Sequence, residues 1–488
     1  MNAEAAVGIA LSCRPTSHTM ELQKNATSDT AGFTLFATTW AIAGILHQMS
    51  FVDWRWHSIH GGVLTAALLW VLLRPSSWVR FAALLLVDCV AVGSEFPVHP
   101  NHIVFAWVVN LTLLTALLIA RLRQTDLSVS SGWYRTFAPW LRIELAVLYF
   151  FTVFHKINES YFNIEWSCAS TMYRQIASWL PLMPSANWSQ YCAVYGTLLI
   201  EVAIPILLFS RRSRVAGAVL GVLFHGFLAL YSFPGLFSFS ATMTALYTVF
   251  IPSELAARIV VPSWLRRFRP YAVGAFAALG VVWLLRDLFP AGLRLEQRWG
   301  HIVQLGFLSY CVYQLGGLVL LLNATRSRNS HAKTPFSGDW RQGVLLVVFP
   351  ILLCVNGFGP YLGLRTQSSF SMFSNLQTED ARGNHLIMPV GIQLTDWQRD
   401  LVEVVDSNDA ELLQVRDDGQ RLPYLDLRRR RGVDNRLSVT FRRNGDLLRF
   451  ASNSPETHGV LPPLGWLAQR YFFFRPVDPN PIQVRCKH

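Results

Sequence analysis

One short stretch joins a hydrophobic segment to side chains that could do acid–base chemistry. The run YFFTVFHKINESY covers residues 149–161 and contains His155, Lys156 and Asn158. Because the residues before it are apolar, Lys156 is predicted at a membrane boundary, where an ammonium ion is costly to desolvate. A lysine whose charged form is disfavoured can act as a general base. The alternative is a snorkelling lysine, with its stem in lipid and its head in water, which is common at helix ends.

Further ionisable residues are predicted within apolar runs. Asp88 and Glu201 lie in such runs, where a carboxylate should pair inward or stay protonated. Pro205 follows Glu201 and can bend that helix toward a site. His225 lies halfway along another run, so it is either a buried histidine bonded to a carbonyl or to Glu201, or part of the site itself.

Histidines gather at one predicted membrane boundary. Two spacings, His57–x2–His60 and His99–x2–His102, could bring pairs of imidazoles together as metal ligands. No HExxH motif stands on a predicted helix, however, and the cysteines are scattered. We therefore expect no metal and favour a hydrogen-bonded base and substrate pocket at this boundary. His57 and His60 are expected to sit at the interface as amphipathic side chains. His47 is predicted to face the same region.

Three sequence segments carry a family resemblance. They are NHIVFAW at 101–107, YFFTVFHKIN at 149–158 and FHGFLALYSFPGLFSFSATM at 224–243. Together, and in this order, they resemble the vitamin K-dependent gamma-carboxylases and the wider horizontally transferred transmembrane (HTTM) domain group. The resemblance implies a multi-span membrane fold with quinol-dependent chemistry at the outer face of the membrane.

By this resemblance, Lys156 would be the base that deprotonates reduced vitamin K or menaquinol. His102 and His225 would belong to the same catalytic region. The quinol would then react with dioxygen, and the strong base so formed would remove a proton from a glutamyl carbon of a protein or peptide, to which carbon dioxide adds. The remaining candidates for quinone binding are Asn101, His155, Asn158 and Glu201.

Composition and hydropathy predict an all-α polytopic membrane protein. The chain has 488 residues and is 52% hydrophobic but only 15% charged, which suits a chain that lies largely in lipid. We divide it into an N-terminal tail over 1–32, a membrane domain over 33–360 and a C-terminal domain over 361–488. Eleven apolar runs approach the length needed to cross a bilayer. They lie near 33–51, 58–74, 78–96, 102–120, 140–157, 191–210, 215–233, 236–251, 271–288, 302–322 and 343–360.

Lysine and arginine set the predicted orientation. They concentrate in alternate connections between the runs, including the clusters at 121–142, 211–214 and 258–269. Because positive charge is retained on the cytoplasmic side, the N-terminus is predicted in the cytoplasm and the C-terminal domain outside, in the periplasm or lumen. The formal net charge of +12 then reflects loops that face anionic membrane lipid, and no nucleic-acid partner is expected.

The C-terminal domain is predicted to be small, β-rich and extracytoplasmic. Asn444 and Gly445 should form a tight hairpin turn between its last two strands. The run Arg428–Arg431 is interpreted as a solvated strand end, the alternative being a patch for an acidic substrate. Five segments are predicted as strands: 401–407, 412–418, 421–429, 436–443 and 447–452.

The segment that follows Lys156 has two notable features. Residues 160–180 are amphipathic and are predicted to lie half-embedded in the membrane interface. Cys168 and Cys192 both fall in this outer region, so we consider a disulfide between them. No CxxC motif occurs, which argues against dithiol redox chemistry.

Two functions of different classes follow. One is a quinol-dependent carboxylase-like enzyme with Lys156 as its base. The other is a non-enzymatic protein that binds quinone or lipid, or a transporter-like scaffold. Substitution of Lys156 by arginine separates them, because arginine cannot act as a base but can replace a snorkelling anchor.

Overall fold

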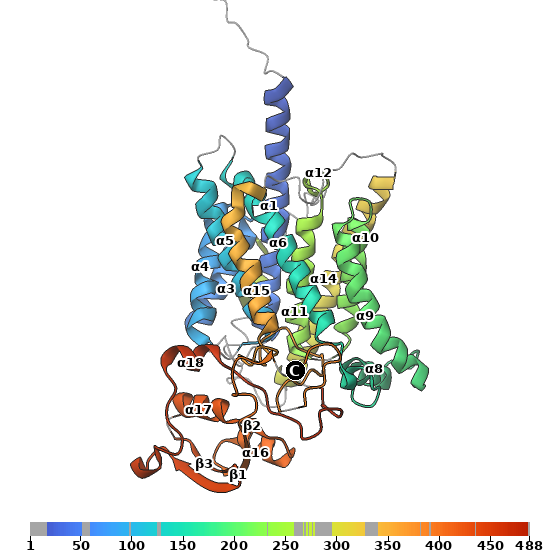
Figure 1. Ribbon diagram of the computed structural model, residues 1–488. Coiled ribbons are helices and arrows are strands. Elements are labelled where there is room, and N and C mark those ends of the chain that lie inside the picture. The colour runs from blue at the N-terminus through green and yellow to red at the C-terminus, as the bar shows by residue number, and fades with distance from the viewer. Residues whose placement is uncertain are drawn as a thin grey trace, which may run out of the picture.

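The computed structural model of the chain is mostly helical. Figure 1 shows a bundle of helices at one end of the molecule and a small domain, formed by the C-terminal part of the chain, at the other. The structure describes residues 17–50, 59–96, 99–123, 128–231, 233–257, 295–326, 340–380, 382–389, 392–434 and 436–486, with scattered helical positions between 267 and 278.

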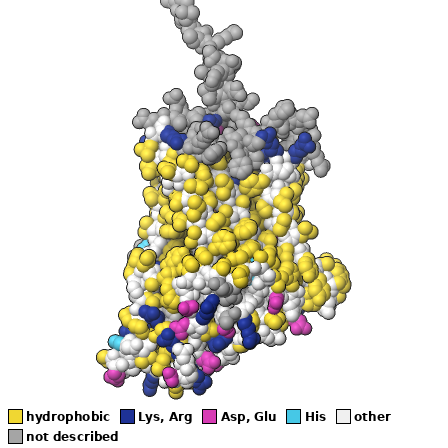
Figure 2. Space-filling model, viewed as in Figure 1, with side chains coloured by type: hydrophobic (Ala, Val, Ile, Leu, Met, Phe, Trp, Pro, Cys, Tyr) yellow, Lys and Arg dark blue, Asp and Glu magenta, His cyan; other side chains and the backbone are white. Residues whose placement is uncertain are grey.

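The bundle has the length and the surface of a membrane domain. Five of its described helices are long and apolar enough to cross a membrane. Figure 2 shows hydrophobic side chains over the lateral face of the bundle, between basic side chains at one end and the charged C-terminal domain at the other. These features indicate a membrane protein. The five helices are α1 (Ser17–Ser50), α5 (Asn101–Leu122), α6 (Val129–Phe154), α9 (Asn187–Phe209) and α14 (Leu295–Arg326).

Shorter helices complete the bundle. The apolar run near 271–288 lies outside the described residues apart from scattered helical positions, and each of the other runs coincides with a described helix. The count of eleven spans remains a prediction. The shorter helices are α3 (Ile59–Leu73), α4 (Trp78–Glu95), α10 (Arg214–Leu228), α11 (Pro234–Tyr247) with η1 (Thr248–Phe250), α12 (Ser253–Ala256), and η4 (Trp340–Val347) with α15 (Val348–Phe358).

Helix α6 brings the lysine segment to one end of the bundle. Its N-terminus is capped by Ser128, whose hydroxyl accepts the N–H of Ser131. Trp133, Phe137 and Leu141 recur at intervals of four residues and are fully buried in the main core. Close packing of these side chains against neighbouring helices stabilises the bundle through van der Waals contacts. The packed face therefore fixes where the C-terminal end of α6 emerges.

Gly357 of α15 allows that helix to pack closely on α6, and its substitution gives a first prediction. A Cβ atom at this position would lie 2.4 Å from Phe151 Cδ2, and the Phe151 ring is held by Phe358 and Phe370. Gly357→Ala should therefore lower the free energy of unfolding by about 1–3 kcal/mol. Thermal unfolding in detergent measures this. A Cβ atom at Gly306 meets nothing within 4 Å, so Gly306→Ala is the control, and equal melting temperatures for both variants would contradict the packing argument.

The C-terminal domain contains a four-stranded antiparallel sheet of order β2-β1-β3-β4. Asn444 and Gly445 both have positive φ, 53° and 92°, which confirms the predicted tight hairpin turn. The predicted strands at 401–407, 436–443 and 447–452 are confirmed within a residue or two. The strands are β1 (Leu401–Ser407), β2 (Leu422–Pro423), β3 (Ser438–Arg443) and β4 (Asp446–Ala451).

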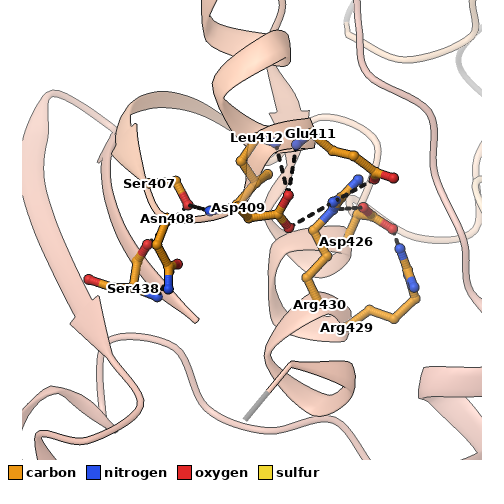
Figure 3. Close-up of polar contacts among 9 residues, drawn as sticks. All are labelled: Ser407, Asn408, Asp409, Glu411, Leu412, Asp426, Arg429, Arg430 and Ser438. Carbon is orange, nitrogen blue, oxygen red and sulfur yellow. Dashed lines mark hydrogen bonds and ion pairs between the residues drawn. The ribbon is translucent and has the colours of Figure 1, made fainter. Parts of the chain in front are cut away.

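The strand predicted at 412–418 is wrong, and that at 421–429 is largely wrong. The first segment belongs to helix α16 (Ala410–Asp417), and the second keeps only β2 before helix α17 (Tyr424–Val433). Asp409 starts α16, because its carboxylate accepts the N–H groups of Glu411 and Leu412. Figure 3 shows this cap. The remaining short helices are η6 (Pro455–Thr457) and α18 (Trp466–Tyr471).

The basic run Arg428–Arg431 lies on α17 and not at a strand end. Asp426 is buried between Arg429 and Arg430, with oxygen–nitrogen distances of 2.8 and 3.3 Å. Arg430 also reaches the carboxylates of Asp409 and Glu411 (Figure 3). Much of the charge in this run is therefore neutralised within the domain.

The Cys168–Cys192 disulfide considered from the sequence is not formed. Cys168, at the start of α8 (Cys168–Trp179), is bonded to Cys486 near the C-terminus, and Cys192 is free and exposed. Proximity in sequence suggested the wrong partner, because the C-terminal segment returns to the end of the bundle. Figure 1 shows α8 at the same level as the junction between the bundle and the C-terminal domain.

Candidate functional site: a cavity beside Lys156

Lys156 lies directly after α6 and forms a buried ion pair with Glu201 of α9. Its Nζ atom donates to both carboxylate oxygens, at 2.8 Å to Oε1 and 2.7 Å to Oε2. Only 5% of Lys156 and 8% of Glu201 are exposed. A snorkelling lysine would place its amine in water, whereas this amine is enclosed. Of the two outcomes expected for Glu201, inward pairing or a protonated carboxyl, the structure shows the inward pairing.

The pair faces a cavity of about 470 Å³. Ligand-binding cavities commonly measure about 300–1,000 Å³ and are lined mostly by apolar side chains with a few polar groups. This one fits that description, because aromatic and aliphatic residues form most of its wall. The polar part of the wall includes Asn101, His102, Lys156 and Glu201.

The cavity reaches the surface between α8 and α9. Two of its lining residues, Leu182 and Trp188, are 91% and 61% exposed. Other apolar side chains on the same exposed side of α9 are Tyr195 and Leu199. Apolar residues at a mouth favour a ligand that arrives from lipid over one that arrives from water.

Asn101 and His102 begin α5 and are anchored in different ways. The side-chain oxygen of Asn101 accepts a hydrogen bond from the backbone N–H of Phe370, which also lines the cavity. Nε2 of His102 lies 2.8 Å from the hydroxyl oxygen of Ser238 on α11. His102 is 1% exposed. Both predicted site residues therefore stand on the cavity wall with fixed orientations.

His155 and Asn158 hold the lysine segment in place but do not line the cavity. Nε2 of His155 donates to the carbonyl of Gly357 on α15 at 3.0 Å. Nδ2 of Asn158 donates to the carbonyl of Ser374 at 2.6 Å. Asn158 also caps the short helix α7 (Glu159–Phe162). These bonds fix the backbone on both sides of Lys156, which is how a supporting shell positions a reactive group.

His225 is buried in α10 behind the cavity wall. Its Nδ1 atom pairs with the hydroxyl of Ser240 at 3.0 Å. This partner is neither Glu201 nor a backbone carbonyl, the two partners considered for a buried His225. The imidazole packs against Phe239, with ring centroids 5.3 Å apart, and Phe239 lines the cavity. A contribution of His225 to ligand binding would therefore pass through Phe239.

The sequence did not predict the loop over residues 366–380, which closes one side of the cavity with Phe370, Met372 and Phe373. It is buried almost throughout. Ser368, Phe370, Phe373, Asn375 and Asp380 have φ between 56° and 69°, a conformation that L-residues other than glycine rarely adopt. Clusters of such residues occur at binding sites, where the surroundings hold them. A polar, aromatic segment directly after an apolar helix was the only signal in the sequence.

Tyr161 adds a hydrogen-bond donor to the wall. Burial, and after it the charge of Glu201, raise the pKa of Tyr161 well above its ordinary value. The phenol therefore stays protonated and can donate to an oxygen atom of a ligand. Among the described residues, no group of three or more His, Cys, Asp or Glu side chains is placed to hold a metal ion.

Comparison with known proteins gave no relatives: no family model, no curated protein and no solved structure matches this chain. The site is therefore interpreted from its own geometry, and the resemblance of the three segments rests on those segments alone.

Proposed function

We propose that this protein binds a membrane-soluble quinol and that the Lys156–Glu201 pair accepts a proton from the quinol hydroxyl. The observation that carries the proposal is a buried ion pair in the wall of an apolar cavity whose mouth has exposed apolar side chains. A molecule with a ring, a hydroxyl group and a long apolar chain fits such a cavity.

The residues present suit a quinol ring. Phe370 and Phe373 from the 366–380 loop, with Phe239, offer flat apolar surfaces. Lys156 and Tyr161 offer donors to a ring oxygen. The cavity volume of about 470 Å³ suits a ring and the first part of its chain. The rest of the chain would extend through the mouth between α8 and α9 into lipid.

The ion pair can accept a proton from the quinol in two transfers, and the protons balance at each one. The amine of Lys156 gives its proton to the carboxylate of Glu201, which leaves a neutral pair in the apolar cavity. The neutral amine then takes the hydroxyl proton of the quinol. The resulting ammonium lies beside the quinolate oxygen and stabilises its charge.

The resemblance extends this proposal to a carboxylase-like reaction. The deprotonated quinol would supply, with dioxygen, the strong base that a glutamyl carbon requires before carbon dioxide adds. The chain's own residues would bind and orient the quinol, exclude water and remove the first proton. A protein or peptide glutamate would have to approach from the side of the C-terminal domain.

The second candidate is a non-enzymatic quinone- or lipid-binding protein. One observation favours it: the charges of Lys156 and Glu201 neutralise each other within the buried pair. A fixed ion pair can recognise a polar head group and take no part in chemistry. The variants of Lys156 described in the Discussion separate the two candidates.

We also propose that the C-terminal domain lies outside the cytoplasm, as the distribution of basic residues predicts. The Cys168–Cys486 disulfide supports this orientation, because disulfides persist in the periplasm, the lumen and extracellular space. The lysine end of α6 then faces the same compartment.

A native thiol tests ligand binding directly. Cys192 is exposed, free and part of the cavity wall. Menaquinol in nanodiscs should slow modification of Cys192 by N-ethylmaleimide several-fold, because the occupied cavity shields the thiol. Mass spectrometry of the peptide that contains Cys192 measures the rate. Cys354, a free cysteine that does not line the cavity, is the internal control. An unchanged rate at saturating menaquinol would contradict binding at this site.

A further inference from the structure

A second, smaller cavity lies in the core of the bundle. It measures about 50 Å³, and its wall includes His47, Asp88 and Asn110 from three different helices. Asn110 donates to Asp88 at 2.6 Å and accepts a bond from Trp40 at 3.2 Å. A cavity of this size has room for water, and the polar side chains in its mostly apolar wall can bind water.

One serine connects this cavity to the cavity beside Lys156. The hydroxyl oxygen of Ser238 lies 2.8 Å from Nε2 of His102, which lines the large cavity, and 2.7 Å from Nδ1 of His47, which lines the small one. Ser238 is fully buried, and the two imidazoles are 1% and 6% exposed. A hydroxyl carries one proton and two lone pairs, so it can accept from one imidazole while it donates to the other.

We propose that His102, Ser238 and His47 form a proton-transfer path from the quinol cavity to Asp88. The inference rests on the proposed function of the large cavity. A proton that arrives on the ring of His102 leaves from Nε2 to Ser238. The hydroxyl proton of Ser238 passes to Nδ1 of His47, and His47 releases its Nε2 proton into the small cavity. Each group gains one proton and loses one, and the carboxylate of Asp88 takes the proton that remains.

The proposed chemistry requires an acceptor for a second proton, and the path would supply one. The Lys156–Glu201 pair can hold one proton taken from a quinol, and the apolar wall around it offers little water to take the next. Asp88 is a carboxylate within the bundle with a donor, Asn110, already in place. Without such a role, a carboxylate at this position of α4 would only destabilise the membrane domain.

Two matched variants of α11 test the path. Ser238→Ala removes the hydroxyl between the imidazoles. Thr244→Val is the control, because Thr244 is equally buried in the same helix, bonds to the carbonyl of Ala241 and lines neither cavity. Menaquinol, bound at one equivalent to each protein in nanodiscs without oxygen, is oxidised by ferricyanide, which accepts electrons but no protons, so the second quinol proton has to leave as well. The absorbance of menaquinone follows the reaction. Ser238→Ala should oxidise bound menaquinol about 10²-fold more slowly, the size of one lost acid–base group, while Thr244→Val should match the wild type.

The outcomes separate the path from the function on which it rests. Wild-type protein that binds menaquinol but forms no quinolate overturns the proposed base and the path together. Menaquinol oxidation at the wild-type rate in Ser238→Ala, with menaquinol binding and quinolate formation intact, overturns the path alone. A pH dye in weak buffer provides the second measurement. Wild-type protein should release no proton to the dye as one equivalent of menaquinol is oxidised, and release of one proton per menaquinol would overturn storage at Asp88.

Discussion

Replacement of Lys156 by alanine is expected to lower quinol-dependent turnover by about 10²–10⁴-fold, the range typical of a lost general base. Lys156→Arg should be equally inactive, because arginine keeps its charge and cannot accept a proton. Turnover is measured as quinol oxidation under air and as incorporation of labelled carbon dioxide into a glutamyl peptide. Full activity of Lys156→Arg would contradict a base at this position and would favour the non-enzymatic candidate.

Lys156→Ala should also reduce the stability of the protein. A double variant separates this loss of stability from the loss of turnover. Lys156→Ala leaves Glu201 buried without its counter-ion, which costs about 3–5 kcal/mol in comparable buried pairs. The double variant Lys156→Met with Glu201→Gln removes both charges and should regain most of the lost melting temperature. Its turnover should stay low. A double variant that recovers activity together with stability would show that the pair is structural.

Loss of the Cys168–Cys486 disulfide should give the largest change in stability outside the ion pair. The bond joins residues 318 positions apart, and disulfides typically contribute about 2–4 kcal/mol. Cys486→Ser should therefore lower the melting temperature clearly. It should also weaken menaquinol binding, because α8 supplies Met172 and Ile176 to the cavity wall. Thermal unfolding and menaquinol titration measure the two effects.

The control for this variant is Cys192→Ser, since Cys192 is free and exposed and should contribute little to stability. Non-reducing peptide mapping should identify a linked pair of peptides that contain Cys168 and Cys486. A linked pair that contains Cys192 would contradict the structure. Equal melting temperatures for Cys486→Ser and the wild type would show that the C-terminal segment is held by its hydrogen bonds alone, such as those of Ser160 and Asn375 with residues 481 and 484.

Several features could be predicted from sequence because their causes are local. Apolar length predicted the helices, since a run of that kind has to be buried or face lipid. Asn444 and Gly445 predicted a hairpin, because both positions of its turn need positive φ. The failure at 412–418 is also local in origin: alternating residues suggested a strand, while Asp409 and its bonds to two N–H groups started a helix.

The candidate site likewise contains residues that the sequence identified and residues that it did not. Lys156, at the end of an apolar run, was visible in the sequence, and so was Glu201 as a carboxylate that had to pair or stay protonated. Nothing local indicated that His155 would turn away to bind the carbonyl of Gly357 on α15, or that Asn158 would bind the carbonyl of Ser374 in the 366–380 loop. The contribution of that loop to the cavity was equally hidden, because its residues carry no periodic pattern.

The sequence by itself determined that this chain builds apolar helices and that a lysine follows the end of α6. Tertiary structure alone decided which groups that amine meets, which cysteine closes the loop to the C-terminus, and that one serine joins two imidazoles. The physical reason is that periodicity and caps act over a few residues. Pairing of Lys156 with Glu201, or of Cys168 with Cys486, depends on how whole helices pack.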